Sequence, residues 1–178
     1  IGAYRIKSEL EDLSLQYLYP DKYKKLEEVK IKIENESSNC LKEMYENINC
    51  ILNNRDIPHE IKIRTKNIYG IYKRLEQGHK ISDIHDLLAL KVMVDDIANC
   101  YQTLGLIHSQ YHPINDKFKD YIYNPKTNMY RSLHTTVFGE DNRLVQTQIR
   151  TFDMDKVASF GLTAYWDIEK GNARNVMQ

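Results

Sequence analysis

The chain has 178 residues and carries 25 Lys and Arg against 25 Asp and Glu, so its net charge is zero. This balance argues against a polybasic nucleic-acid binder, and we expect no direct DNA binding. No run of 18 apolar residues is present, which argues against a membrane span, and the length suits one domain with a substantial core.

Helical patterns dominate the first 57 residues. The pattern predicts a short helix over 9–19, with Ser8 as its N-cap, and a long amphipathic helix over 21–52. The long segment reads either as one helix or as two helices in line around residues 35–39. We expect residues 1–57 to form a helical support or connector ahead of a second unit, residues 58–178.

Strands and helices alternate after Pro58. The order predicts an α/β or α+β domain with one mixed sheet and helices on its faces. We expect strands at 59–65, 87–94, 133–138 and 144–150, helices at 67–77, 96–111 and 153–169, and a polar loop over 115–128.

The three cysteines are few and widely spaced. Cys40, Cys50 and Cys100 include no CxxC pair, which predicts buried free thiols in a reducing cytosol. The start at Ile1 shows neither an initiator Met nor a signal-peptide pattern, so we expect a fragment of a longer cytoplasmic protein.

Polar side chains follow several of the predicted strands. Arg64 lies on one strand, Asp86 directly precedes the most apolar strand, and Gln146, Gln148 and Arg150 alternate along the last one. Such an alternating face is ordinarily an exposed sheet surface, and an Asp at a strand entry is more often a turn residue than a metal ligand.

The loop over 117–130 mixes Lys with Tyr and Phe, a composition that suits stacked bases and bound phosphates as well as a solvated loop. The sequence contains neither GxxxxGK[ST] nor GxGxxG. If phosphates bind here, side-chain cations and a metal ion must hold them.

A series of ordered blocks resembles the synthetase domain of the RelA/SpoT family. The blocks are Arg64-Thr65-Lys66, Asp86 to Leu90, Phe118 to Ile122, Asn124-Pro125-Lys126, Tyr130 to Thr135 and Gln148 to Thr151. The stretch Ile6 to Leu13 also resembles the connector that precedes this domain in long Rel enzymes, and Lys117 to Asp120 resembles the motif of the bifunctional kind.

The resemblance implies a nucleotidyltransferase-like sheet and transfer of pyrophosphate from ATP to the 3′-hydroxyl of GDP or GTP, which makes the stringent-response alarmone (p)ppGpp. Arg64, Lys66 and Arg74 would hold ATP, and Asp86 would bind Mg²⁺. The guanine nucleotide would lie among Lys126, Asn128, Tyr130, His134, Gln148 and Arg150.

The chain departs from the family pattern at several of these positions. The family normally has Glu at the position of Gln146, where it completes the metal site and is a candidate for activating the attacking hydroxyl. Gln carries no charge and accepts no proton at neutral pH. Other departures are Gly70, Lys91, Met129, Asp155, Ser159 and Tyr165.

Three functions therefore stay open. The first is an active pyrophosphokinase, with Asp86 and Gln146 at its catalytic centre. The second is an impaired synthetase that binds guanine nucleotide and regulates an adjacent hydrolase domain. The third, a synthetase that modifies the 3′ end of tRNA, is disfavoured by the neutral charge. The resemblance further implies an upstream HD hydrolase domain and ribosome-linked regulatory domains in the full-length protein.

Overall fold

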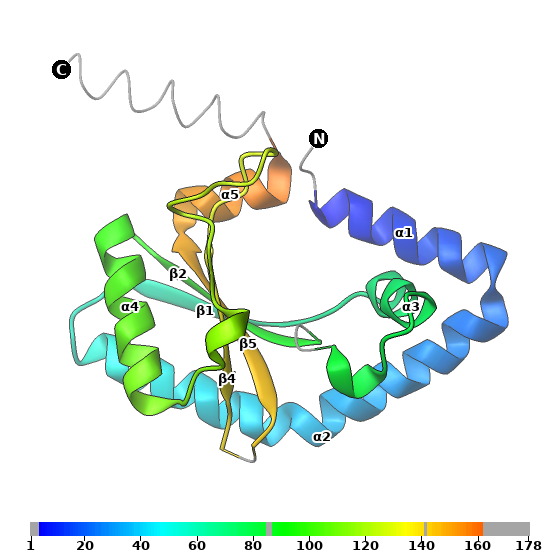
Figure 1. The fold of residues 1–178 in the computed structure, drawn as a ribbon, viewed down its shortest axis with the longest axis horizontal. Helices are drawn as coiled ribbons and strands as arrows, with labels where there is room; N and C mark the ends of the chain where they lie inside the picture. The colour runs from blue at the N-terminus through cyan, green and yellow to red at the C-terminus, as the bar shows by residue number, and fades with distance from the viewer. Residues whose placement is uncertain (1–3, 85–86, 141, 162–178) are drawn as a thin grey trace.

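The computed structural model describes residues 4–84, 87–140 and 142–161. Two helices come first, and a five-stranded sheet with three further helices follows (Figure 1). The helices are α1 (Tyr4–Leu18), α2 (Pro20–Asn53), α3 (Ile68–Glu76), α4 (Ile97–Gln110) and α5 (Phe152–Phe160). The strands are β1 (His59–Thr65), β2 (Leu88–Val94), β3 (Lys119–Asp120), β4 (Leu133–Phe138) and β5 (Leu144–Thr151).

The sheet is mixed and has the order β1-β2-β5-β4-β3. Strands β2 and β5 are parallel, and every other neighbouring pair is antiparallel. This arrangement confirms the predicted mixed α+β class with helices around one sheet.

One face of the sheet carries the main core. Leu90 and Val92 of β2, with Ile149 of β5, are fully buried on this face. Helices α2 and α4 cover them with residues such as Met44 and Ile107. Because side chains alternate along a strand, the intervening residues of β2, β4 and β5 lie on the opposite face, which these helices leave open.

A second, smaller core joins α1, the N-terminal half of α2, and α3. It contains Leu15 of α1, Leu26 of α2 and Ile71 of α3. The Asp12 carboxylate of α1 accepts hydrogen bonds from the backbone N–H of Tyr69 at 2.8 Å and, more weakly, of Ile68 at 3.4 Å. Asp12 therefore caps the start of α3 from a neighbouring helix and fixes its position beside the sheet.

Several predicted boundaries were wrong. Ser8 lies inside α1, since that helix has already begun at Tyr4. Of the two alternatives left open for residues 21–52, the single helix is confirmed, because α2 is continuous over 34 residues. The predicted polar loop contains the short strand β3. Helix α5 ends at Phe160 because Gly161 adopts φ +81°, which a right-handed helix does not accommodate; residues 162–169 lie outside the described part.

The cysteines are free, and two of them fit the prediction. Cys40 and Cys100 are buried, whereas Cys50 is exposed on α2. Whether residues 1–57 form a separate unit stays a prediction; the C-terminal half of α2 shares the main core with the sheet. None of the helices in the described part combines the length and apolar character that a membrane span requires.

Candidate functional site

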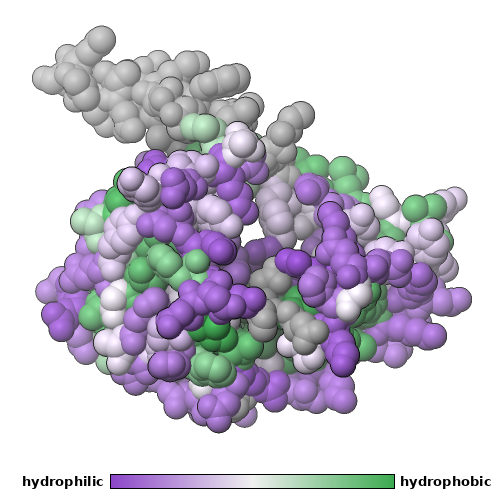
Figure 2. Space-filling view, viewed as in Figure 1, coloured by the Kyte–Doolittle hydropathy of each residue, from purple (hydrophilic) through white to green (hydrophobic). Residues whose placement is uncertain are grey.

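The open face of the sheet forms the floor of a cleft of about 890 Å³. Figure 2 shows this hollow, bordered largely by hydrophilic residues. Cations dominate the described lining, which contains Lys7, Arg64, Lys66, Arg74, Lys91, Lys117, Lys119, Lys126 and Arg150. Asp155 is the one carboxylate among the described lining residues. A chain with no net charge thus gathers positive charge in one place, which suits a polyanionic ligand.

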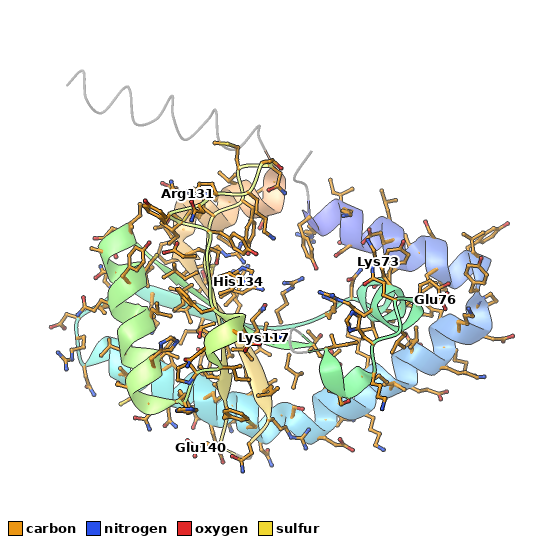
Figure 3. All side chains as sticks on the ribbon, viewed as in Figure 1. Lys73, Glu76, Lys117, Arg131, His134 and Glu140 are labelled. Carbon is orange, nitrogen blue, oxygen red and sulfur yellow. The ribbon has the colours of Figure 1, made fainter. Side chains whose placement is uncertain are left out.

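The cleft brings together residues that the sequence analysis selected from distant segments. Ten of them line it: Arg64, Lys66, Arg74, Lys126, Asn128, Tyr130, His134, Gln146, Gln148 and Arg150. The remaining predicted residue, Asp86, lies outside the described part of the chain, and so does Tyr165. Figure 3 shows His134 and Lys117 on the sheet side of the opening, with Lys73 and Glu76 on α3 across from them.

An aromatic cluster forms one wall of the cleft. The rings of Tyr121, Tyr130 and His134 meet edge to face, with centroids 5.2–6.1 Å apart. The Tyr130 hydroxyl and His134 Nε2 are hydrogen-bonded at 2.7 Å. The Lys126 ammonium lies 4.5 Å from the centre of the Tyr121 ring and 5.1 Å from that of Tyr130. A flat ring beside cations is a surface on which a nucleobase stacks.

Burial raises the pKa of the Tyr130 phenol, and the nearby Arg150 opposes that shift. The hydroxyl therefore stays protonated at neutral pH and keeps its hydrogen bond with His134. The Arg150 guanidinium lies 5.3 Å from the centre of the Tyr130 ring, so the aromatic wall rests on the charged floor of the cleft.

A chain of hydrogen bonds runs along β5. Arg150 Nη2 donates to Gln148 Oε1 at 2.8 Å, and Gln148 Nε2 donates to Gln146 Oε1 at 2.8 Å. Gln148 and Arg150 are both 4% exposed, whereas Gln146 is half-buried. The expected exposed face is therefore wrong for Gln148 and Arg150, because the polar side chains satisfy one another beneath the cleft.

Asp155 of α5 connects this floor to β2. Its Oδ1 lies 2.8 Å from Lys91 Nζ and 3.6 Å from Arg150 Nε. Lys91 and Asp155 both depart from the family pattern, and here they form an ion pair with each other. Both side chains of the pair are less than one-fifth exposed, so the pair holds α5 over the sheet. The one carboxylate among the described lining residues is therefore already neutralised by cations of the protein.

The opposite wall comes from β1, α3 and α1. Arg64 donates to the hydroxyl of Tyr4, and its guanidinium lies 4.6 Å from the centre of the Tyr4 ring. Arg74 extends from α3, whose start is capped by Asp12. The two predicted groups of nucleotide ligands thus lie on two walls of a single cleft.

Sequence reasoning missed part of the lining. Tyr4 and Lys7 reach the cleft from α1, a segment interpreted only as a support, and Lys91 and Asp155 had been noted only as departures. Lys119 and Tyr121 belong to the basic and aromatic loop and could have been chosen from it. Met129 has φ +64°, a left-handed conformation that favours glycine, which explains why the family pattern has Gly there.

The described residues do not by themselves form a metal site. They contain no group of three or more His, Cys, Asp or Glu side chains that could hold an ion. Asp155 is paired with two cations, and the Gln146 oxygen accepts from Gln148. A metal in this cleft would therefore need ligands beyond the described residues, such as phosphate oxygens of a bound ligand.

Comparison with known proteins identifies a family and several relatives. Residues 63–173 match the family described as a region found in RelA / SpoT proteins. A guanosine-3′,5′-bis(diphosphate) 3′-pyrophosphohydrolase of Aquifex aeolicus is 39% identical over 96% of the chain. A GTP pyrophosphokinase of Myxococcus xanthus is 37% identical over 97%, and a bifunctional (p)ppGpp synthase/hydrolase of Mycobacterium tuberculosis is 35% identical over 98%. The chain spans only 23–25% of the length of these three relatives.

Solved structures share the fold. The small alarmone synthetase 2 of Bacillus subtilis aligns with a TM-score of 0.62 at 23% identity, over 80% of this chain and 82% of that one. The small alarmone synthetase 1 of the same organism, solved with its product pppGpp, aligns with a TM-score of 0.58 at 18% identity, over 81% of this chain and 80% of that one.

Proposed function

Because this chain belongs to the RelA/SpoT family, we propose that it is a GTP pyrophosphokinase domain whose cleft binds ATP together with GDP or GTP. The 3′-hydroxyl oxygen of the guanine nucleotide forms a bond to the β-phosphorus of ATP, the bond to the AMP oxygen breaks, and the hydroxyl proton is released. The observation that carries the proposal is the concentration of cations and aromatic rings in one cleft of a neutral chain.

The two walls suggest how the nucleotides are divided. We assign the ATP phosphates to Arg64, Lys66 and Arg74, which come from the β1 and α3 side. The guanine nucleotide then lies on the opposite wall, with its base on Tyr130. Its other ligands would be Lys126, Asn128, His134, Gln148 and Arg150. Transfer between two bound phosphate esters depends mainly on position and on neutralising charge, which cations on both walls supply.

We also propose Mg²⁺ as the cofactor, held by Asp86 and by the phosphates of ATP. When bound, the ion would neutralise charge that develops on the transferred phosphates. The protein's own cations would share that task, since nine Lys and Arg side chains of the described residues line the cleft.

A second candidate function rests on Gln146. At this position the described structure offers a neutral amide, with its oxygen already bonded to Gln148. A divalent ion beside one carboxylate instead of two loses a Coulomb attraction on the order of a few kcal/mol, for an effective dielectric of about 20. Since about 1.4 kcal/mol changes a rate tenfold, such a loss is worth several decades of activity. On this hypothesis the domain binds guanine nucleotide and regulates a neighbouring hydrolase domain without making product.

Incubation of the protein with Mg²⁺, ATP and GTP, followed by chromatography of the nucleotides, separates the two candidates. Formation of pppGpp and AMP in equal amounts at an enzymatic rate supports the pyrophosphokinase. No product from the native chain, with product from the Gln146→Glu variant, supports the impaired synthetase. No product from either chain contradicts the first proposal.

We propose further that the chain is part of a long Rel-type cytoplasmic enzyme of the stringent response. The curated relatives are about four times its length, and one of them is named as both a synthase and a hydrolase. On this proposal an HD hydrolase domain precedes the chain and ribosome-linked regulatory domains accompany it. The full-length reading frame tests this directly.

A further inference from the structure

The polar chain along β5 has a direction that fixes which atom Gln146 offers to the cleft. Arg150 is its starting point, because a guanidinium has only donors. Its Nη2 donates to Gln148 at 2.8 Å, its Nε faces Asp155 at 3.6 Å, and the residue is 4% exposed. Arg150 is thus held on two sides and stays charged.

The orientation of Gln148 follows from this contact. Its oxygen must face Arg150, because the reverse orientation would place an NH₂ group against the N–H groups of a buried guanidinium. The NH₂ group of Gln148 therefore lies at the other end, where it donates to Gln146 Oε1 at 2.8 Å. With 4% exposure, Gln148 has little water to compensate a reversed amide.

The same reasoning then fixes Gln146. Its oxygen is turned toward Gln148, which leaves its Nε2 as the remaining polar atom. Within the described ranges no group accepts a hydrogen bond from that nitrogen, and Gln146 lines the cleft. The cleft floor therefore presents an N–H donor at this point.

From this directionality we infer that Gln146 donates a hydrogen bond to an oxygen of the bound guanine nucleotide and that GDP binds to this wall without a metal ion. The inference rests on the proposed function, since it assumes that a guanine nucleotide occupies the cleft. Phosphate and ribose oxygens accept hydrogen bonds, and the surrounding cations match the phosphate charge. A metal cation is disfavoured beside an N–H donor. Gln148 and Arg150, proposed above as ligands of the nucleotide, also orient Gln146 in this account, and Asp155 holds Arg150 in place.

The test measures GDP binding by calorimetry, once in EDTA and once in Mg²⁺. The native chain should bind GDP with nearly the same affinity in both buffers. The Gln146→Glu variant replaces the donor by an anion of almost the same shape, so its affinity in EDTA should fall at least tenfold and recover in Mg²⁺. The exposed Gln102→Glu variant on α4 makes the same change of net charge outside the cleft and should match the native chain.

A second variant tests the chain of hydrogen bonds along β5 while leaving residue 146 unchanged. In Gln148→Glu the new carboxylate still accepts from Arg150 but cannot donate to Gln146. The Gln146 amide should therefore reverse and turn its oxygen to the cleft. We expect GDP affinity in EDTA to fall at least tenfold and to rise again with Mg²⁺. A merely structural defect would weaken binding equally in both buffers.

Two results would overturn the inference. If Gln146→Glu binds GDP in EDTA as tightly as the native chain, residue 146 donates nothing to the ligand. If the native chain itself needs Mg²⁺ for GDP binding, the inference that GDP binds without a metal ion is wrong, although the pyrophosphokinase proposal survives. Absence of GDP binding in either buffer contradicts both proposals.

Discussion

At the scale of single residues, the cleft works through side chains that hold one another in place. Tyr130 touches Lys126, His134 and Arg150, and Asp155 touches Lys91 and Arg150. Arg150 thus takes part in both groups of contacts. A substitution at Tyr130 tests the role of the first group in ligand binding, and a substitution at Asp155 tests the role of the second in the stability of the fold.

Tyr130→Ala removes the ring on which we place the guanine base. Loss of a base–aromatic stack costs about 1–3 kcal/mol, so GDP affinity should fall about 5- to 150-fold. Calorimetry with GDP measures the change. Tyr123→Ala serves as the control, because Tyr123 lies in the same loop but is 80% exposed and outside the cleft lining. Equal affinity of the Tyr130 variant and the native chain would refute the stacking role.

Asp155→Asn removes the carboxylate that neutralises Lys91 and Arg150. Breaking a fully buried ion pair costs about 3–5 kcal/mol; because this pair is partly exposed, we expect a loss of roughly 1–3 kcal/mol in the free energy of unfolding. Urea denaturation gives the value. Asp153→Asn on the same helix breaks only the exposed pair with Lys156 and should change the stability by less than about 0.5 kcal/mol. Equal effects at both positions would show that the Asp155 contacts add nothing.

At the scale of elements, the sequence predicted most helices and strands but not how they end. Polar and apolar residues alternate along β5, and β2 is an almost continuous apolar run. Both are strong strand patterns, and the structure contains both strands. Strand β3 has two residues and no pattern of its own, since pairing with β4 alone creates it. The start of α3 depends on Asp12, which lies 57 residues before Tyr69, and local sequence carries no sign of such a cap.

The packing of α4 on β4 should make stability depend on pH. His108 of α4 is hydrogen-bonded to Thr135 Oγ1 at 2.7 Å, and burial lowers the pKa of its imidazole below 6.5. The unfolded chain therefore binds a proton at a higher pH than the folded chain does. Stability should fall as the pH drops below about 6.5, until the folded-state pKa is passed.

Urea midpoints measured from pH 7.5 to pH 5 test this dependence. His108→Gln retains a hydrogen-bonding side chain but does not titrate, so its midpoint should fall less over this range than that of the native chain. Because other groups titrate in both proteins, the difference between the two curves is the quantity of interest. Parallel curves would mean that His108 titrates alike in the folded and unfolded chains.

At the scale of the whole molecule, a chain with no net charge places nine of its 25 Lys and Arg side chains, counted over the described residues, around one cleft. The sequence predicted ten lining residues: seven lie in ordered blocks that resemble a family, and the same resemblance implied roles for Arg74, Asn128 and Gln146. It did not predict Tyr4, Lys7 or the pairing of Lys91 with Asp155. Those contacts join segments far apart in the chain, and only the fold brings them together.

Thiol labelling reports on the compactness of the same fold. Burial raises the pKa of the Cys100 thiol to about 12, with Asp96 and Asp95 adding to the shift, and Cys40 is 4% exposed. Iodoacetamide at pH 8 should therefore modify only Cys50 in the folded protein, and all three cysteines after denaturation. Mass spectrometry counts the adducts. Rapid labelling of Cys100 in the folded protein would contradict the packing of α4 against the sheet.

The central claim is that the cleft on the open sheet face holds a guanine nucleotide. A crystal structure of the chain grown with GDP tests it most directly. We predict the base on the Tyr130 ring and the phosphates among Lys126, His134 and the neighbouring cations, with a nucleotide oxygen near Gln146 Nε2. GDP bound elsewhere on the molecule, with this cleft empty, would contradict the account.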